Sequence, residues 1–235
     1  EHIVMCDSRG VIRSDRPGLG GAKKEFATDR DLHTLADALK DADVFLGLSV
    51  ADVMTPEMLL NMAPKPIVFA LANPNPEIDH DLALATRKDL IFATGRSDFS
   101  NQINNVLGFP YIFRGALDCD ASQINEEMKL AAARAVAGLA RVPATEELHR
   151  MYPDKQLEFG PKYILPKPFD KRLLPVVSSA VAEAAERSGV ARRPITDYGA
   201  YRRWLATLID RENRYMSDLM LHEGHSMHIS EMSDR

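Results

Sequence analysis

The feature that most constrains this chain is an alternation of short apolar runs with helical segments between residues 43 and 99. The runs ADVFLGLS, PIVFALANP and LIFATGRSD carry no polar alternation, which is typical of parallel strands buried on both faces. The segments between them have helical character, and Thr55 and Pro56 suit the cap and first position of the first helix. The alternation therefore predicts a doubly wound α/β fold with helices on both faces of a parallel sheet.

The flanking segments supply further elements. The apolar run HIVMCD predicts a buried strand that ends at Asp7, and residues 142–170, rich in proline, glycine and aromatic residues, predict an ordered covering loop. The glycine-rich stretch 17–24 has the wrong spacing for a phosphate-binding fingerprint, so it predicts a flexible loop. That first strand covers residues 2–7. The remaining predicted elements are helices: one with its apolar stripe at residues 32–39, one over residues 123–141, and one over residues 173–188 that is closed by Gly189.

Composition narrows the class of protein. The 235 residues are 45% hydrophobic and 27% charged, which fits a globular chain, and the net charge of −5 argues against nucleic acid as a partner. No apolar run approaches the length of about eighteen residues that a membrane helix needs, so we expect no membrane association. Two cysteines, Cys6 and Cys119, are too few for a disulfide framework, which favours the reducing cytoplasm.

Candidate ligand-binding residues follow the predicted strands, because open parallel sheets bind ligands at the carboxyl ends of their strands. Asp7 comes at the end of the run HIVMCD, and Ser49 at the end of ADVFLGLS. Asn73 comes at the end of the strand predicted in PIVFALANP. The segment from Gly95 to Asn105 follows the fourth predicted strand and is rich in amides, which need partners when they are buried. Each of these residues could equally serve a turn or a helix cap, so the pattern alone leaves both interpretations open.

Longer motifs add a family resemblance. CDSRGVI, FALANPNPEI, TGRSDFSNQINNVLGFPYIFRGALD, INEEMKLAAARAVAGLA and FGPKYILPKPFDKRL together resemble the cofactor-binding domain of malic enzymes. The resemblance covers residues 1–200 nearly continuously, and it is closest to the bacterial hybrid-type branch, which is often NADP-dependent. It implies a Rossmann-like domain that lacks its first strand and its glycine-rich turn in this chain, and we expect the chain to be part of a longer polypeptide.

The resemblance also assigns roles to single residues. Asp7 corresponds to the acidic residue that meets the adenine ribose, and the Ser49 loop to the backbone under the nicotinamide half. Asn73 and Asn105 correspond to asparagines that hold malate, and Asn73 is counted among the cofactor-binding residues as well. Asn104 corresponds to the asparagine near the nicotinamide ribose and amide. Amides suit these roles because they orient a hydroxy acid without adding a titratable group.

The activity that the resemblance implies is oxidative decarboxylation of malate to pyruvate and CO₂, with reduction of NADP or NAD and help from Mg²⁺ or Mn²⁺. The family's catalytic lysine, tyrosine and metal carboxylates lie upstream of the matching segment. We therefore assign no catalytic residue and no metal ligand, and we expect this chain alone to be inactive. The expected division is a partial NAD(P)-binding domain at 1–204 and a tail or linker at 205–235, within a parent protein that forms homo-oligomers.

Cofactor choice and the chain's tail stay open from sequence. A carboxylate at Asp7 repels a 2′-phosphate, but Arg9 and Arg13 follow closely and favour NADP. In the tail, His222, His225 and His228 recur every three residues, a spacing that can bind a metal, although a solvated end is the simpler interpretation. The alternative functions are a non-catalytic, truncated nucleotide-binding or interaction module, or another hydroxy-acid or amino-acid dehydrogenase.

Overall fold

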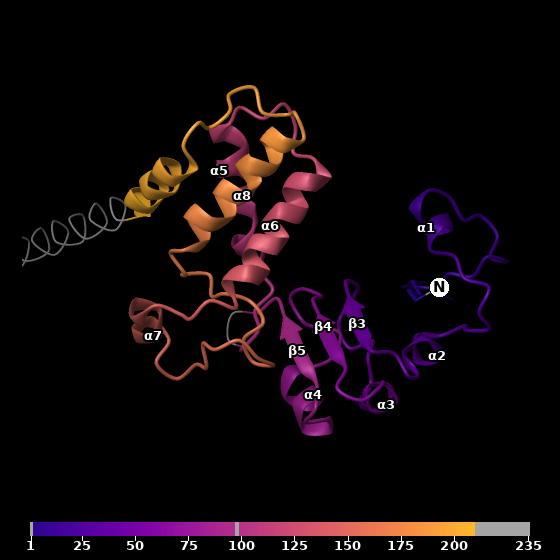
Figure 1. Ribbon diagram of the computed structural model, residues 1–235. Helices are drawn as coiled ribbons and strands as arrows, with labels where there is room; N and C mark the ends of the chain where they lie inside the picture. The colour runs from indigo at the N-terminus through magenta and orange to yellow at the C-terminus, as the bar shows by residue number, and fades with distance from the viewer. Residues whose placement is uncertain (1, 97–98, 210–235) are drawn as a thin grey trace, which may run out of the picture. The chain divides into compact units, whose positions relative to one another are not determined.

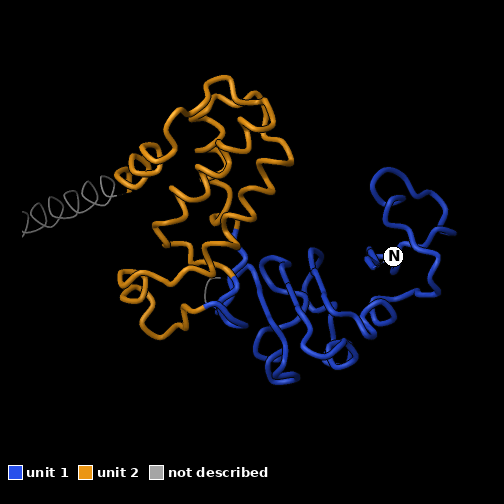
Figure 2. Tube along the Cα trace, viewed as in Figure 1, with its two compact units in different colours: residues 1–104, 159–164 blue, residues 105–158, 165–235 orange. Residues whose placement is uncertain are grey.

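The computed structural model describes residues 2–96 and 99–209. The chain divides into two compact units (Figure 2). Unit 1 comprises residues 1–104 and 159–164, and unit 2 comprises residues 105–158 and 165–235. Within the described ranges, none of the helices combines the length and the apolar character that crossing a membrane requires.

Unit 1 is built on a parallel sheet of three strands in the order β3-β4-β5 (Figure 1). The strands are β3 (Val44–Gly47), β4 (Ile67–Ala70) and β5 (Ile91–Thr94). The register pairs Gly47 with Ala70 and Ala70 with Thr94, so the carboxyl ends of all three strands lie at one edge. The parallel pairing predicted from the three apolar runs is confirmed. The predicted burial on both faces is wrong for β3, because Val44 and Leu46 are 53% and 57% exposed.

Short helices with side-chain caps connect these strands. The Thr34 hydroxyl and the Asp37 carboxylate form a reciprocal capping box, and the Thr55 hydroxyl accepts from the backbone N–H of Met58, as the sequence predicts. The helices are α2 (Leu35–Leu39), α3 (Pro56–Leu60) and α4 (His80–Thr86). The core between sheet and helices is apolar, and its most deeply buried members include Leu59, Val68, Ile78 and Ala83.

The predicted strand at residues 2–7 is wrong in extent and in pairing. Only β1 (Cys6–Asp7) is extended, and it pairs antiparallel with β2 (Gly10–Val11) in a two-stranded sheet of its own. Gly10 has a φ of 97°, which favours glycine, and a Cβ there would lie 2.2 Å from the backbone oxygen of His33. The chain therefore reverses directly after Asp7. The short helix α1 (Ala22–Glu25) follows.

Unit 2 is helical, and its helices α5, α6 and α8 pack side by side (Figure 1). Gly115 on α5 allows close packing, because a Cβ there would lie 2.4 Å from the backbone oxygen of Ser178 on α8. Gly189 has a φ of 73° directly after α8, as a closing glycine requires. The elements are η1 (Asn105–Leu107), α5 (Phe109–Asp118), α6 (Glu126–Leu139), α7 (Glu146–Met151) and α8 (Leu173–Arg187), followed by helical backbone over 198–209.

Two predictions from the sequence concern unit 2 and can be compared with its structure. The helices predicted at 123–141 and 173–188 are confirmed as α6 and α8. The predicted covering loop at 142–170 contains a helix, α7, whose first turn is capped by the Thr145 hydroxyl. Leu205 is fully buried in the core of this unit, together with Met128 and Val177.

Candidate functional site

The carboxyl edge of the parallel sheet carries two of the predicted site residues. Ser49 follows β3 by two residues, and Asn73 follows β4 by three. Both residues are exposed, and no other described residue makes a hydrogen bond to the Asn73 amide. An exposed amide at this sheet edge can bind a ligand that carries hydroxyl or carboxylate groups.

A buried carboxylate joins these two strand-end loops. The Glu77 residue is 0% exposed, although it lies in the loop that precedes α4. Its Oε1 accepts from the backbone N–H of Ser49 at 2.9 Å and from the Ser49 hydroxyl at 3.4 Å. Its Oε2 accepts from the backbone N–H of Ala72 at 3.0 Å. One side chain therefore ties Ser49 to the residue directly before Asn73.

Gly47 makes room for that carboxylate at the last position of β3. A Cβ at Gly47 would lie 2.4 Å from Cδ of Glu77 and 2.5 and 2.7 Å from its two oxygens. The backbone of the same loop is also fixed, since the N–H of Met54 donates to the carbonyl of Glu77 at 2.9 Å. Sequence reasoning missed Glu77, and its only sequence signal was a carboxylate inside the ANPNPEI motif.

The amide-rich segment after β5 divides into a structural part and an exposed part. Asn101 is 3% exposed and has a structural role, because its Nδ2 donates to the carbonyls of Phe92 and Pro161 and its Oδ1 accepts from the N–H of Ile164. Asn104 and Asn105 are both exposed. Asn104 closes the first segment of unit 1, and Asn105 opens unit 2 and begins η1.

Asp7 ends β1 and lies among cations. Its Oδ1 accepts from Nη2 of Arg16 at 2.5 Å, and its Oδ2 accepts from Nζ of Lys23 at 2.7 Å. The backbone N–H of Arg9 also donates to Oδ1, at 3.0 Å. The hydrogen bonds from Arg16 and then Lys23 hold the pKa of Asp7 well below its usual range. Asp7 is therefore a charged acceptor at neutral pH.

The cations at Asp7 differ from those expected. Arg13 pairs with Asp15 at 3.1 Å and with Asp31 at 3.2 Å, so its guanidinium is directed to those carboxylates. Arg16 and Lys23 are the residues whose side chains reach Asp7, and Lys23 comes from the stretch predicted as a flexible loop. Two cations around one carboxylate can accept a ligand with hydroxyl groups and a phosphate.

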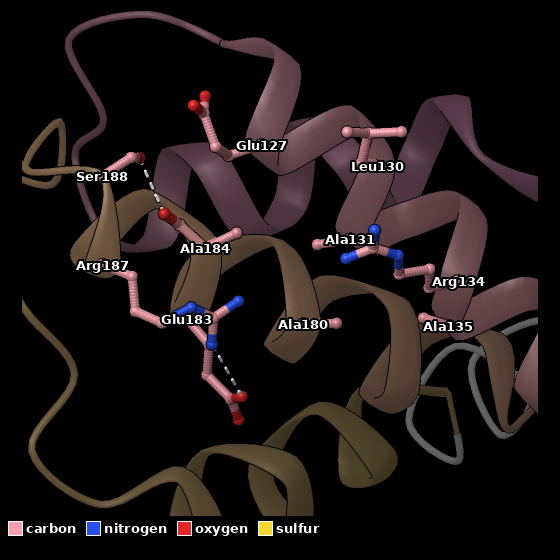
Figure 3. A pocket seen from close by; sticks show the side chains of 10 residues that line it. All are labelled: Glu127, Leu130, Ala131, Arg134, Ala135, Ala180, Glu183, Ala184, Arg187 and Ser188. Carbon is pink, nitrogen blue, oxygen red and sulfur yellow. Dashed lines mark hydrogen bonds and ion pairs between the residues drawn. The ribbon is translucent and has the colours of Figure 1, made fainter.

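Unit 2 contains an open groove of about 630 Å³ between α6 and α8 (Figure 3). Alanines form its floor, and its rim carries both charge signs, with Arg187 lying 3.9 Å from Glu183. None of the predicted site residues lines it. The lining residues are Glu127, Leu130, Ala131, Arg134, Ala135, Ala180, Glu183, Ala184, Arg187 and Ser188.

Over residues 2–96 and 99–209, no three histidine, cysteine, aspartate or glutamate side chains gather where they could hold a metal ion. His222, His225 and His228, singled out by their spacing, lie outside the described residues.

Comparison with known proteins identifies the family. Residues 1–157 match the family model described as malic enzyme, NAD binding domain. The chain is 56% identical over 194 residues to the NADP-dependent malic enzyme of Halomonas elongata, covering 83% of this chain and 46% of that protein. It is 50% identical over 217 residues to an NAD-dependent malic enzyme of Rhizobium meliloti, covering 92% of this chain and 27% of that protein.

A solved structure agrees with these matches. The crystal structure of the Entamoeba histolytica malic enzyme superimposes with a TM-score of 0.78 at 31% identity, covering 94% of this chain and 44% of that chain. The chain thus spans less than half the length of each of these three relatives. Its fold is a Rossmann-like NAD-binding domain, and its parallel sheet with helices fits that class. The chain belongs to the malic enzyme family.

Proposed function

We propose that this chain forms the cofactor-binding part of a malic enzyme that converts malate and NADP⁺ to pyruvate, CO₂ and NADPH. The bound dinucleotide would accept the hydride from C2 of malate while the C2 hydroxyl loses its proton. The resulting keto acid would then lose CO₂, and the enolate left behind would take up a proton at C3 to give pyruvate. The observation that carries the proposal is the sheet edge of unit 1. There a single carboxylate joins the Ser49 loop to the Asn73 loop, in a chain whose family oxidises malate with a dinucleotide.

The proposed roles divide between cofactor and substrate. Ser49 and Asn104 bind the nicotinamide half of the dinucleotide, and Asp7 binds the adenine ribose. Asn73 and Asn105 bind malate, and Asn73 also borders the cofactor. Both are exposed, and an amide can donate to a carboxylate and accept from a hydroxyl at the same time.

NADP is the proposed cofactor in preference to NAD. Asp7 alone would repel a 2′-phosphate, but its charge is matched by Arg16 and Lys23 at 2.5 and 2.7 Å. A phosphate placed beside this carboxylate would meet two cations, and the ribose 3′-hydroxyl would still find an acceptor. The Halomonas elongata relative is NADP-dependent, whereas one Rhizobium meliloti relative is NAD-dependent, so the family uses both.

Several features of the parent protein belong to the same proposal. A divalent Mg²⁺ or Mn²⁺ would polarise the keto acid as a Lewis acid, and we assign none of the described residues to it. The parent is proposed to be a cytoplasmic homo-oligomer. The range expected from sequence to be a tail or linker, residues 205–235, begins too early, because Leu205 packs in the core of unit 2. The 235 residues alone are proposed to be unable to turn malate over.

The experiment measures pyruvate and NADPH produced by the gene product that carries this sequence. We expect both to form in equal amounts and only when malate and a divalent metal are present. Replacing Asn73 or Asn105 with Ala should raise the KM for malate at least about tenfold, since each removes a charge-assisted hydrogen bond. Asn61→Ala, at the exposed end of α3, is the matched control. Dinucleotide binding without malate turnover would instead favour the non-catalytic module.

A further inference from the structure

We propose that Glu77 is a positioning residue for this reaction, which sets the cofactor loop at Ser49 against the malate loop at Asn73. The inference rests on the proposed function, because it concerns how the two ligands of that reaction are aligned. Glu77 would touch neither ligand. Its effect would pass through the backbone of the two loops that do.

The two oxygens of Glu77 are divided between the loops. Oε1 holds Ser49 through its backbone N–H and its hydroxyl, and Oε2 holds Ala72 through its backbone N–H. Backbone donors cannot rotate away as side chains can, so each loop is fixed at a stated point. A movement of the carboxylate would therefore shift both loops together.

The choice of a carboxylate needs an explanation, because burying a charge is costly. Glu77 is 0% exposed, and no lysine or arginine in the described ranges forms an ion pair with it. Joining two N–H donors requires an acceptor at both ends of one side chain, and glutamine would turn an NH₂ donor toward one of them. A carboxylate offers one acceptor oxygen to each of the two backbone donors.

The surrounding backbone reinforces the same junction. The N–H of Asp52 donates to the carbonyl of Pro76 at 3.2 Å, and the N–H of Met54 donates to the carbonyl of Glu77 at 2.9 Å. The N–H of Leu71 donates to the carbonyl of Gly47 at 3.1 Å, at the point where the side chain of Gly47 is absent. Hydrogen bonds to Glu77 and between the two backbones thus hold the Ser49 loop and the Asn73 loop together.

Such bracing matters for hydride transfer because the reacting carbon atoms must meet at close range. A misplacement of about 1 Å can cost a factor of about 100 in rate even when both ligands still bind. Loosening one loop would therefore lower kcat more than it weakens either ligand's binding.

The test is Glu77→Gln in the gene product that carries this sequence, with Glu57→Gln on the exposed face of α3 as the matched control. We expect kcat to fall about 10- to 100-fold, with the Kd for NADP and the KM for malate changing by less than about threefold. Hydrogen exchange should show a faster backbone N–H at Ser49 or Ala72 in Glu77→Gln only. The control should keep wild-type values.

A second variant acts on the same carboxylate without altering it. Gly47→Ala places a Cβ within 2.7 Å of both Glu77 oxygens, so the carboxylate must shift. We expect the same fall in kcat with little change in Kd or KM, which keeps the proposal testable if Glu77→Gln does not fold. A kcat per folded molecule within about twofold of wild type in either variant would overturn the positioning role alone. A wild-type protein that binds dinucleotide but never oxidises malate would overturn the proposed function together with it.

Discussion

Two carboxylates in unit 1, one at the end of a strand and one in the loop after a strand, have different surroundings. Asp7, the last residue of β1, has a side chain that is 17% exposed, and it accepts from two cationic side chains as well as one backbone N–H. Glu77, in the loop after β4, is fully buried and accepts from backbone N–H groups and one hydroxyl. The first arrangement can exchange partners when a charged ligand arrives, whereas the second is part of the fold.

The two carboxylates therefore suit different tasks: Asp7 suits the selection of the cofactor, and Glu77 suits the alignment of the two ligands. Residues that select a ligand need contacts that can be remade, and ion pairs at a partly exposed site are of that kind. Residues that align two ligands need contacts that do not move, and buried bonds to backbone are of that kind. Variants at Asp7 should therefore change cofactor preference, and variants at Glu77 should change stability and rate.

The largest expected effect is on stability at Glu77. Glu77→Ala leaves the part-buried N–H groups of Ser49 and Ala72 without their acceptor and empties the buried space of the side chain, so we expect the free energy of unfolding to fall by about 2–4 kcal/mol. Urea denaturation followed by circular dichroism measures it. Glu57→Ala, which removes an exposed carboxylate, should change the same quantity by less than about 0.5 kcal/mol. Equal losses in the two variants would contradict the structural role of Glu77.

The next effect concerns Lys23. Lys23→Ala removes one of the two cations at Asp7, so we expect the KM for NADP to rise about tenfold, equivalent to about 1.4 kcal/mol. The KM for NAD should change less than about twofold, because NAD has no 2′-phosphate for the lysine to meet. Lys24→Ala, at the neighbouring exposed position on α1, is the control. A parallel rise for both cofactors would argue against a phosphate at Lys23.

A smaller effect is expected at Asp7 itself. Asp7→Asn keeps the shape of the side chain but removes the charge that repels a 2′-phosphate, and it leaves one acceptor oxygen where Arg16 and Lys23 now have two. We expect the NADP to NAD ratio of kcat/KM to rise about fivefold, because the charge that opposes the 2′-phosphate is removed. Steady-state kinetics with both cofactors measures the ratio. A fall in this ratio would show that Asp7 supports the phosphate site.

The smallest effect is on pH dependence. Because Arg16 and Lys23 hold the pKa of Asp7 well below its usual range, this carboxylate stays charged from pH 8 down to pH 5. A 2′-phosphate has a pKa of about 6, so NADP binding should weaken about threefold over that interval while NAD binding stays flat. Titration calorimetry at both pH values measures this difference, and an equal pH dependence for both cofactors would contradict it.

The lowered pKa of Asp7 also makes the stability of the fold depend on pH. A carboxylate whose pKa is lower in the folded state stabilises the fold above its unfolded pKa of about 3.9, and loses this contribution as the pH falls through the folded value. The ion pairs of Asp7 should therefore persist throughout the neutral range and fail only in strong acid.

Much of the fold follows from local pattern. The strands β3, β4 and β5 coincide with apolar runs, and Thr55 caps α3 where the sequence places a hydroxyl before Pro56. The prediction of a strand over residues 2–7 was wrong because an apolar run does not show which strand it will pair with. Its pairing is set by the reversal at Gly10, which depends on the distant His33.

The candidate site shows the same limit. Asp7, Ser49 and Asn73 could be selected because each follows a predicted strand. Glu77 could not, because its partner Ser49 lies 28 residues away in sequence. Likewise, Lys23 is 16 residues from Asp7, and nothing local shows that they form an ion pair.

The central claim is that cofactor selection and reaction alignment reside at different carboxylates. The most direct test is to measure the Kd for NADP and for NAD in the wild-type gene product, in Lys23→Ala and in Glu77→Gln. The account predicts that Lys23→Ala lowers the preference for NADP about tenfold, and that Glu77→Gln leaves the preference within about twofold of wild type. A preference that changes in Glu77→Gln, or that is unchanged in Lys23→Ala, would contradict the account.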